Sequence, residues 1–188
     1  MRLRFTLRHY LILQICLAVL LLATTATPAF ATVKWLSTVV PVQQAKSNWC
    51  WAASGEMIEK HFGGTLSQWA NVDYIYHNQN YPNYTASLNQ TNQAINHFQT
   101  KRTGMTISSG LTFLSVKYQI NCGGPMAAGW GYYSGGGHMT VVRGYDDDTA
   151  TRYVYWVNPA DGAGHKNTYN WFYDDGVHRW VESIYFYQ

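Results

Sequence analysis

The sequence changes its hydrophobic period once, at Cys122-Gly123-Gly124-Pro125, and this change constrains the fold more than any other feature. Before it, apolar residues recur every three or four positions, which is typical of amphipathic helices. After it, short runs rich in Val, Tyr and Trp are separated by Gly or Asp clusters, which is typical of strands joined by turns. This order predicts an α+β domain in which an N-terminal helical half packs against a C-terminal antiparallel β half, with a cleft between them.

The same patterns give approximate element positions. We expect an extended segment over residues 32–44, a helix over 48–62, and a second helix that opens with the Thr65 to Gln68 capping box. The Asn-rich residues 78–92 are typical of a loop, and shorter helices are expected near 93–100 and 111–120. Strands are expected over 126–130, 138–145, 153–157 and 181–187.

Residues 1–31 have the features of a cleaved signal peptide. Three arginines precede an apolar run over residues 10–23, and Ala29-Phe30-Ala31 is the small-x-small pattern that a signal peptidase cuts after. An uncleaved anchor helix is the alternative, but the apolar run is shorter than the roughly 20 residues that a membrane span needs. We therefore expect a secreted or periplasmic protein with one domain over residues 32–188.

The charge of the mature chain argues against two classes of partner. Three of the 13 basic residues lie in the predicted signal peptide, which leaves ten basic residues against ten acidic ones. A near-neutral domain lacks the electrostatic attraction that nucleic-acid binding requires. We expect a monomer that binds neither nucleic acid nor, after signal cleavage, a membrane.

Cys50 and Cys122 are the two cysteines that remain after residue 31. In an exported protein such a pair can form a structural disulfide, which is one interpretation. The other follows from the position of Cys50 at the start of the first predicted helix. Unpaired backbone N–H groups and the helix dipole favour a thiolate there, so we expect a lowered pKa and a nucleophilic sulfur.

A nucleophilic thiolate needs an imidazole base and a group that orients this base. His138 follows Gly135-Gly136-Gly137 at the start of the clearest predicted strand. Asn158 ends the strand over residues 153–157, from where its side chain could reach the imidazole. Asp161 is a charged competitor for the orienting role, but it lies farther on in a turn.

Attack on an amide carbonyl places negative charge on oxygen, and hydrogen-bond donors stabilise that charge. The backbone N–H of Cys50 is one candidate donor. The side-chain amide of Gln44 is the other, six residues before the cysteine, and Gln43 stays open as an alternative.

With Gln44 before Cys50-Trp51, then Gly-Gly-His138 and Asn158-Pro159, the chain resembles the papain-like cysteine peptidases. It is most similar to small bacterial members, which include secreted effector proteases of the AvrRpt2 type and bacteriocin-leader peptidases. The resemblance extends over residues 40–157. It implies a papain-like fold, a thiolate–imidazolium pair of Cys50 and His138, an oxyanion hole with Gln44, and Asn158 as the third member of the triad.

These observations predict a thiol protease that hydrolyses peptide or protein substrates through a thioester acyl-enzyme, with no metal or organic cofactor. An amidase, a deamidase or a transglutaminase-like enzyme with the same triad is the first alternative. The second alternative is a non-catalytic exported binding module that a Cys50–Cys122 disulfide stabilises.

Overall fold

The computed structural model describes residues 32–78, 80–147 and 151–186, which belong to the compact unit Ala31–Gln188. The predicted signal peptide, residues 1–31, lies outside the described residues and stays a prediction. Within the described ranges, no helix combines the length and the apolar character that a membrane crossing requires.

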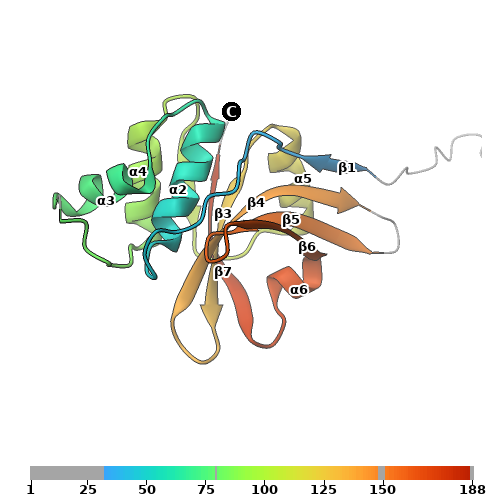
Figure 1. The fold of residues 1–188 in the computed structure, drawn as a ribbon. Helices are drawn as coiled ribbons and strands as arrows, with labels where there is room; N and C mark the ends of the chain where they lie inside the picture. The colour runs from blue at the N-terminus through green and yellow to red at the C-terminus, as the bar shows by residue number, and fades with distance from the viewer. Residues whose placement is uncertain (1–31, 79, 148–150, 187–188) are drawn as a thin grey trace, which may run out of the picture. The chain divides into compact units, whose positions relative to one another are not determined.

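Seven antiparallel strands form one sheet (Figure 1). Hydrogen-bonded neighbours follow the order β2-β7-β3-β4-β5-β6, and β1 pairs with the C-terminal part of β4, beyond the part that pairs with β3. The strands are β1 (Val33–Trp35), β2 (Gly104–Ile107), β3 (Met126–Tyr132), β4 (Gly137–Asp147), β5 (Arg152–Asn158), β6 (Ala163–Thr168) and β7 (His178–Phe186).

Five helices accompany this sheet in the described part of the chain, which confirms the predicted α+β class. They are α2 (Cys50–His61), α3 (Gln68–Tyr76), α4 (Leu88–Phe98), α5 (Phe113–Asn121) and α6 (Tyr169–Tyr173). In Figure 1, α2, α3 and α4 are grouped on one side, and α5 and α6 lie on the other.

The sheet is buried on both of its faces. On one face, Ile184 and Phe186 of β7 belong to a core that also contains Met57 of α2. On the other face, Trp180 of the same strand belongs to a second core that contains Val116 of α5. The helices therefore do not form one half of the molecule as predicted, because α5 covers the face opposite to α2.

Helix α2 is almost completely enclosed, since every residue from Trp51 to Glu59 is buried. It ends where Gly63 adopts a positive φ of 90° and the backbone N–H of Gly64 donates to the Glu59 carbonyl at 2.8 Å. The prediction of a helix over 48–62 is confirmed to within two residues at its start and one at its end.

Helix α3 begins at Gln68, so the predicted capping box at Thr65 is wrong. The backbone N–H of Gln68 donates to the Glu56 carboxylate at 2.8 Å, and its side chain bonds the backbone of Gln43 and Ala45. A carboxylate of α2 therefore satisfies a free donor at the helix start, and this contact cannot be inferred from the local sequence.

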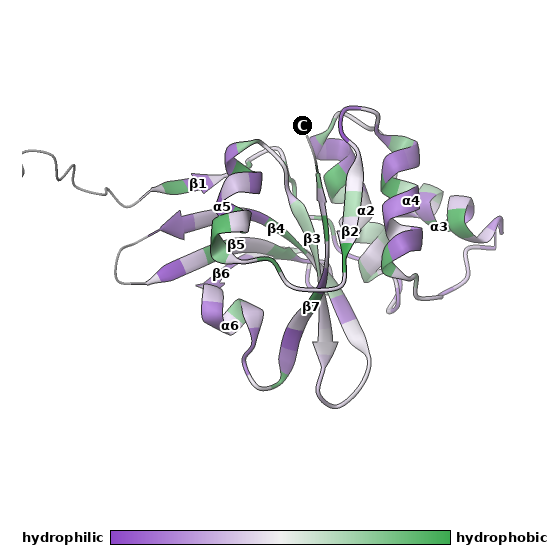
Figure 2. Cartoon of the chain, turned by 180° about the vertical axis from the view of Figure 1, so that it is seen from behind, coloured by the Kyte–Doolittle hydropathy of each residue, from purple (hydrophilic) through white to green (hydrophobic). Residues whose placement is uncertain are grey.

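Helix α4 begins at Leu88, inside the stretch that was predicted to be a loop. Ser87 and Gln90 form a complete capping box, the signature of a helix start that the abundance of asparagine obscures. The helix carries both hydrophilic and hydrophobic segments (Figure 2), and Ala94 and Ile95 are buried. Packing of this apolar side outweighs the weak helix propensity of asparagine.

The four predicted strands are present as β3, β4, β5 and β7, each with slightly different bounds. Strands β2 and β6 and helix α6 were not predicted. Both strands lie at sheet edges, where one row of hydrogen bonds suffices and strong hydrophobic alternation is not needed. In the extended segment, Val33–Trp35 forms strand β1, and Thr32 and Leu36 on either side also form backbone hydrogen bonds with β4.

Glu59 is an acidic residue without solvent exposure inside the helical layer. Its carboxylate oxygens have no hydrogen bond of normal geometry among the described residues. Gly55 and the Asn71 amide pack beside them, and Asn71 only partly offsets the effect of burial. Burial raises the pKa of this carboxyl from its ordinary 4.5 to about 8, because the charged form loses its hydration. Glu59 is therefore protonated in the folded protein at neutral pH.

This burial makes stability depend on pH. Between pH 4.5 and 8 the folded chain holds a proton on Glu59 that the unfolded chain releases. The contribution of Glu59 to the free energy of unfolding therefore falls as pH rises, by up to about 1.4 kcal/mol per pH unit. Glu59→Gln should remove that slope and stabilise the protein at pH 8. Urea unfolding of both proteins at pH 5 and pH 8 measures the difference. If the free energy of unfolding fell by the same amount from pH 5 to pH 8 in both proteins, Glu59 would not be the group with the raised pKa.

Candidate active site

Cys50 and His138 line one cavity of about 310 Å³. The walls come from the start of α2, from the segment before α4, and from β3, β4 and β7. The ten lining residues are Cys50, Trp51, Thr85, Ala86, Trp130, Gly136, Gly137, His138, Met139 and Glu182. Folding therefore brings together a cysteine and a histidine that are 88 positions apart in the sequence.

Cys50 is the first residue of α2, and its side chain is half-buried. Burial raises the pKa of its thiol, and the backbone N–H groups of Met139, Trp51 and Cys50 itself oppose this rise. The expectation of a lowered thiol pKa is therefore wrong for this structure. The helix start acts in the predicted direction, but desolvation of the charged sulfur is the larger effect.

Two buried tryptophans fix the backbone around the sulfur. Trp49 donates its indole N–H to the Pro82 carbonyl, and Trp51 donates its own to the Tyr84 carbonyl, each at 3.0 Å. Both bonds attach the start of α2 to the segment that precedes α4. This anchoring holds Cys50 in place, and Trp51 also lines the cavity beside it.

His138 is the second residue of β4, and its Nε2 atom lies 2.7 Å from the side-chain oxygen of Asn158. Because that amide oxygen can only accept, Nε2 carries the hydrogen and donates it. The neutral imidazole then has its proton on Nε2 and a lone pair on Nδ1, which makes no hydrogen bond with the described residues. The residue after His138, Met139, directs its backbone N–H at the Cys50 sulfur.

Asp161 lies behind Asn158 rather than beside the imidazole. Asn158 donates its side-chain N–H to Asp161 at 3.1 Å, and the same carboxylate oxygen lies 2.9 Å from His165. Asp161 thereby fixes which end of the Asn158 amide faces His138. From the sequence, Asp161 was a competitor for the role of orienting His138. In the structure it contacts Asn158, and Asn158 contacts His138.

The pKa of His138 is lowered, chiefly because burial disfavours the imidazolium. The hydrogen bond to Asn158 and the negative charge of Asp161 act in the opposite direction, and His178 adds to the lowering. With the thiol pKa raised and the imidazole pKa lowered, the site favours a neutral Cys50–His138 pair.

Neither glutamine offers an amide N–H to the cavity. Gln44 directs its side-chain nitrogen to the carbonyls of Lys46 and Ser47, at 3.0 and 2.7 Å, and its oxygen is buried without a hydrogen bond. Gln43 contacts the Ala160 carbonyl at 3.3 Å. In this conformation the donor predicted at Gln44 is occupied, so its role stays a proposal.

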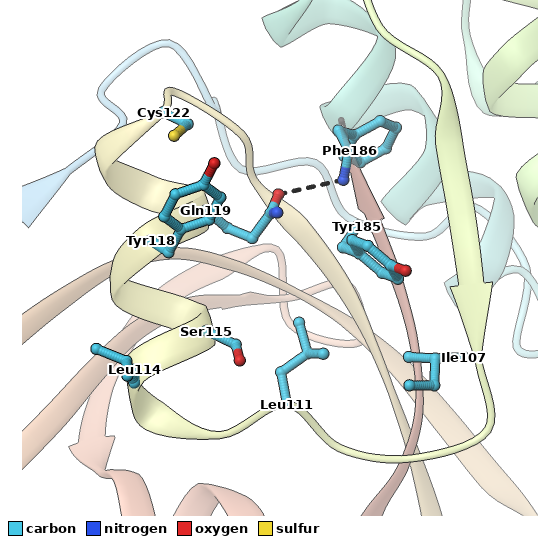
Figure 3. A pocket seen from close by; sticks show the side chains of 9 residues that line it. All are labelled: Ile107, Leu111, Leu114, Ser115, Tyr118, Gln119, Cys122, Tyr185 and Phe186. Atoms are coloured by element: carbon cyan, nitrogen blue, oxygen red, sulfur yellow. Dashed lines mark hydrogen bonds between the residues drawn. The ribbon is translucent and has the colours of Figure 1, made fainter. Parts of the chain in front are cut away.

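No disulfide joins Cys50 and Cys122. Cys122 lines a different, more apolar cavity of about 580 Å³ between α5 and the β2–β7 edge, together with Leu111, Leu114 and Tyr118 (Figure 3). That cavity is larger, but no His, Lys, Asp or Glu is among its lining residues, so the cavity of Cys50 is the candidate active site. Within the described ranges, no group of three or more His, Cys, Asp or Glu residues could hold a metal ion.

Glu182 is the one ionisable lining residue that was not predicted from the sequence. Glu182 of β7 reaches the cavity through the pairing of β7 with β3, which joins positions more than 50 residues apart. Neither a motif nor local spacing marks this carboxylate. The nearest signal is a single acidic residue in a strand that also contains Trp180, Val181 and Ile184.

Comparison with known proteins supports a papain-like cysteine peptidase. The family model described as "Peptidase_C39 like family" matches residues 36–183, so the chain belongs to the C39-like peptidase family. A crystal structure of a Bacillus anthracis protein assigned as a C39-like peptidase has the same fold. It shows a TM-score of 0.63 and 14% identity, with 84% of this chain and 98% of that chain covered. No curated protein matches the sequence significantly.

The neutral pair predicts how fast the thiol reacts in the absence of substrate. Since the thiolate, not the thiol, attacks the CH2 carbon of iodoacetamide and displaces iodide, the alkylation rate of Cys50 should keep rising above pH 9.0, the ordinary pKa of a thiol. We would measure this rate by mass spectrometry on residues 32–188 carrying Cys122→Ser. A high, level rate between pH 5 and 7 would instead demonstrate a thiolate–imidazolium pair.

The position of Asp161 predicts a second titration effect. Because its negative charge favours the imidazolium, Asp161→Asn should lower the pKa of His138. The NMR titration of the His138 ring proton measures this pKa, with His138→Gln to assign the signal. Asp73→Asn, which removes a carboxylate from α3, is the matched control and should leave the pKa unchanged.

Proposed function

We propose that this protein is an exported cysteine peptidase that hydrolyses peptide bonds through a thioester acyl-enzyme on Cys50. One observation carries the proposal: Cys50 and His138 share a cavity, and Asn158 holds the distal nitrogen of that histidine at 2.7 Å. A nucleophile, a base and an orienting group in this order form the arrangement that nucleophilic catalysis requires. The cavity is the proposed substrate cleft.

In the first step, the Cys50 sulfur attacks the carbonyl carbon of the scissile amide and gives its proton to Nδ1 of His138. The sulfur–carbon bond forms as the carbonyl π electrons move to oxygen. His138 then returns the proton to the leaving nitrogen, the carbon–nitrogen bond breaks, and a thioester remains on Cys50. This route starts from a neutral pair, which is the state that burial favours.

In the second step, His138 takes a proton from water, and the resulting hydroxide attacks the thioester. The second tetrahedral intermediate collapses, the carboxylic acid product leaves, and the proton returns to the Cys50 sulfur. Asn158 keeps the imidazole in the tautomer with Nε2 protonated throughout, because its oxygen accepts the Nε2–H bond.

The oxyanion needs donors within the same cavity. The backbone N–H of Cys50 lies at the open start of α2, where the first amide groups have no partner within the helix. The Gln44 side chain is the second proposed donor. It would have to leave the Lys46 and Ser47 carbonyls when substrate binds, which its buried, unpartnered oxygen favours.

The proposal that the protein is exported depends on residues 1–31. Their apolar run and the Ala29-Phe30-Ala31 site support signal-peptide cleavage and a secreted or periplasmic location. The proposed mature enzyme acts as a monomer on peptide or protein substrates. Its near-neutral charge argues against nucleic acid and against membrane binding after cleavage.

A substrate panel tests this function. The parent protein should cleave members of a proteome-derived peptide library, and Cys50→Ala should lose this activity by about 10³-fold or more. His138→Ala should lose roughly 10²- to 10⁴-fold through loss of the base. Cys122→Ser lies outside the cavity and serves as the matched control, with activity retained.

Equal cleavage by the parent and Cys50→Ala would refute the assignment. Glutamine amides, amine acceptors and cell-wall muropeptides belong in the same panel, because an acyl-enzyme on Cys50 could also serve deamidation, transglutamination or amidase chemistry. Cys50-dependent turnover of these alone would replace the peptidase proposal with that alternative.

A further inference from the structure

We infer that Glu182 selects peptide substrates that carry a cationic side chain, of the lysine or arginine type, beside the scissile bond. This inference deepens the proposed function, on which it rests, by naming a substrate class. The carboxylate of Glu182 is the one acidic group among the ten residues that line the Cys50–His138 cavity, and no basic Lys or Arg side chain lines it.

The sheet directs Glu182 toward the nucleophile. On β7, Glu182 lies on the same face as Ile184 and Phe186, two and four positions later, which belong to the core that α2 covers. The register shift between Gly129 and Trp130 in the β3–β7 pairing places Trp180 on the opposite face. Cys50 packs against the same core. Glu182 therefore extends from the sheet face that carries the nucleophile.

A glycine makes room for this carboxylate to reach the cavity. Gly129 of β3 lies opposite Glu182 in the sheet, and on its other side it pairs with Met139 of β4. A Cβ atom on residue 129 would lie 2.4 Å from Cγ of Glu182 and 2.7 Å from its Oε1, closer than atoms can approach. Since Gly129 has no side chain, that of Glu182 lies across β3 toward Met139.

Met139 connects this row to the reacting atoms. It follows His138 in β4, and its backbone N–H faces the Cys50 sulfur. A row of neighbouring residues thus runs across three strands, from Glu182 of β7 through Gly129 of β3 to Met139 of β4, and it ends beside the Cys50 sulfur. A substrate carbonyl positioned for attack by Cys50 would place a neighbouring side chain in this part of the cavity.

The Glu182 carboxylate has no counter-charge of its own. It forms no hydrogen bond or ion pair with any residue in the described ranges, and it is half-buried. Burial alone raises the pKa of this carboxyl. An acidic group that is partly desolvated and unpaired gains most from a cation that arrives with a ligand.

Matched peptides test this selection. N-acetylated peptides that differ at one position, with lysine or its neutral isostere norleucine, would be scanned across the scissile bond; acetylation removes the competing terminal amine. For at least one position we expect the parent protein to prefer lysine about tenfold or more in kcat/KM. Glu182→Gln, which keeps the shape of the side chain, should reduce this ratio to near one.

Two further variants separate position from overall charge. Asp146→Asn removes one negative charge at the opposite end of β4 and should keep the parent ratio. Gly129→Ala should lose the preference as Glu182→Gln does, because the added Cβ displaces the carboxylate. Thermal unfolding followed by circular dichroism establishes that each variant is folded before its ratio is compared.

Binding distinguishes this inference from the proposed function. Calorimetric titration of Cys50→Ala with the lysine and norleucine peptides should show the same preference, and adding Glu182→Gln should abolish it. Absence of Cys50-dependent cleavage, with this binding preference intact, would refute only the peptidase proposal. Equal binding of the two peptides to Cys50→Ala at every position, or a preference that survives Glu182→Gln, would overturn the role of Glu182.

Discussion

Packing of the start of α2 against β4 is the contact on which the site depends. Helix α2 is buried along nine consecutive residues, and Ser54 donates to the Met139 carbonyl while the Met139 N–H faces the Cys50 sulfur. The N–H and the C=O of one strand residue, Met139, are thus both in contact with the helix. Since interiors are close-packed, this contact leaves little freedom in the position of the sulfur relative to His138.

Burial that fixes the geometry also decides the charge state. Burial strengthens the hydrogen bond between His138 and Asn158, but it disfavours isolated ions at Cys50 and His138. Asp161, at the outer end of this chain of hydrogen bonds, is exposed. Substrate chemistry that starts from uncharged groups is compatible with both effects. The helix start then contributes mainly when charge develops during attack, rather than by storing a thiolate beforehand.

The sequence predicted those parts of the fold that have a strong local period. Helix α2 and strands β3, β4, β5 and β7 fall near their expected positions because burial imposes regular apolar spacing on them. It could not predict the start of α3, which a carboxylate of α2 caps, or edge strand β6, whose residues are mostly polar. Long-range contacts decide both.

In the site, too, some features follow from the local sequence and others depend on long-range contacts. Local settings were enough to single out Cys50, His138 and Asn158, since each lies at the end of a regular element. The occupied amide of Gln44 and the place of Glu182 depend on neighbours brought by folding, and no spacing rule encodes them.

One helix holds the reactive sulfur at its first residue and an ionisable acid in the interior nine residues later. Raising the surrounding pH supplies more thiolate at Cys50, but in the same interval it begins to ionise Glu59 within the helical layer. A rise in pH would thus make Cys50 a faster nucleophile and at the same time make the fold less stable. Such a chain suits neutral or mildly acidic surroundings, and relatives adapted to alkaline media would be expected to lack an acid at this position.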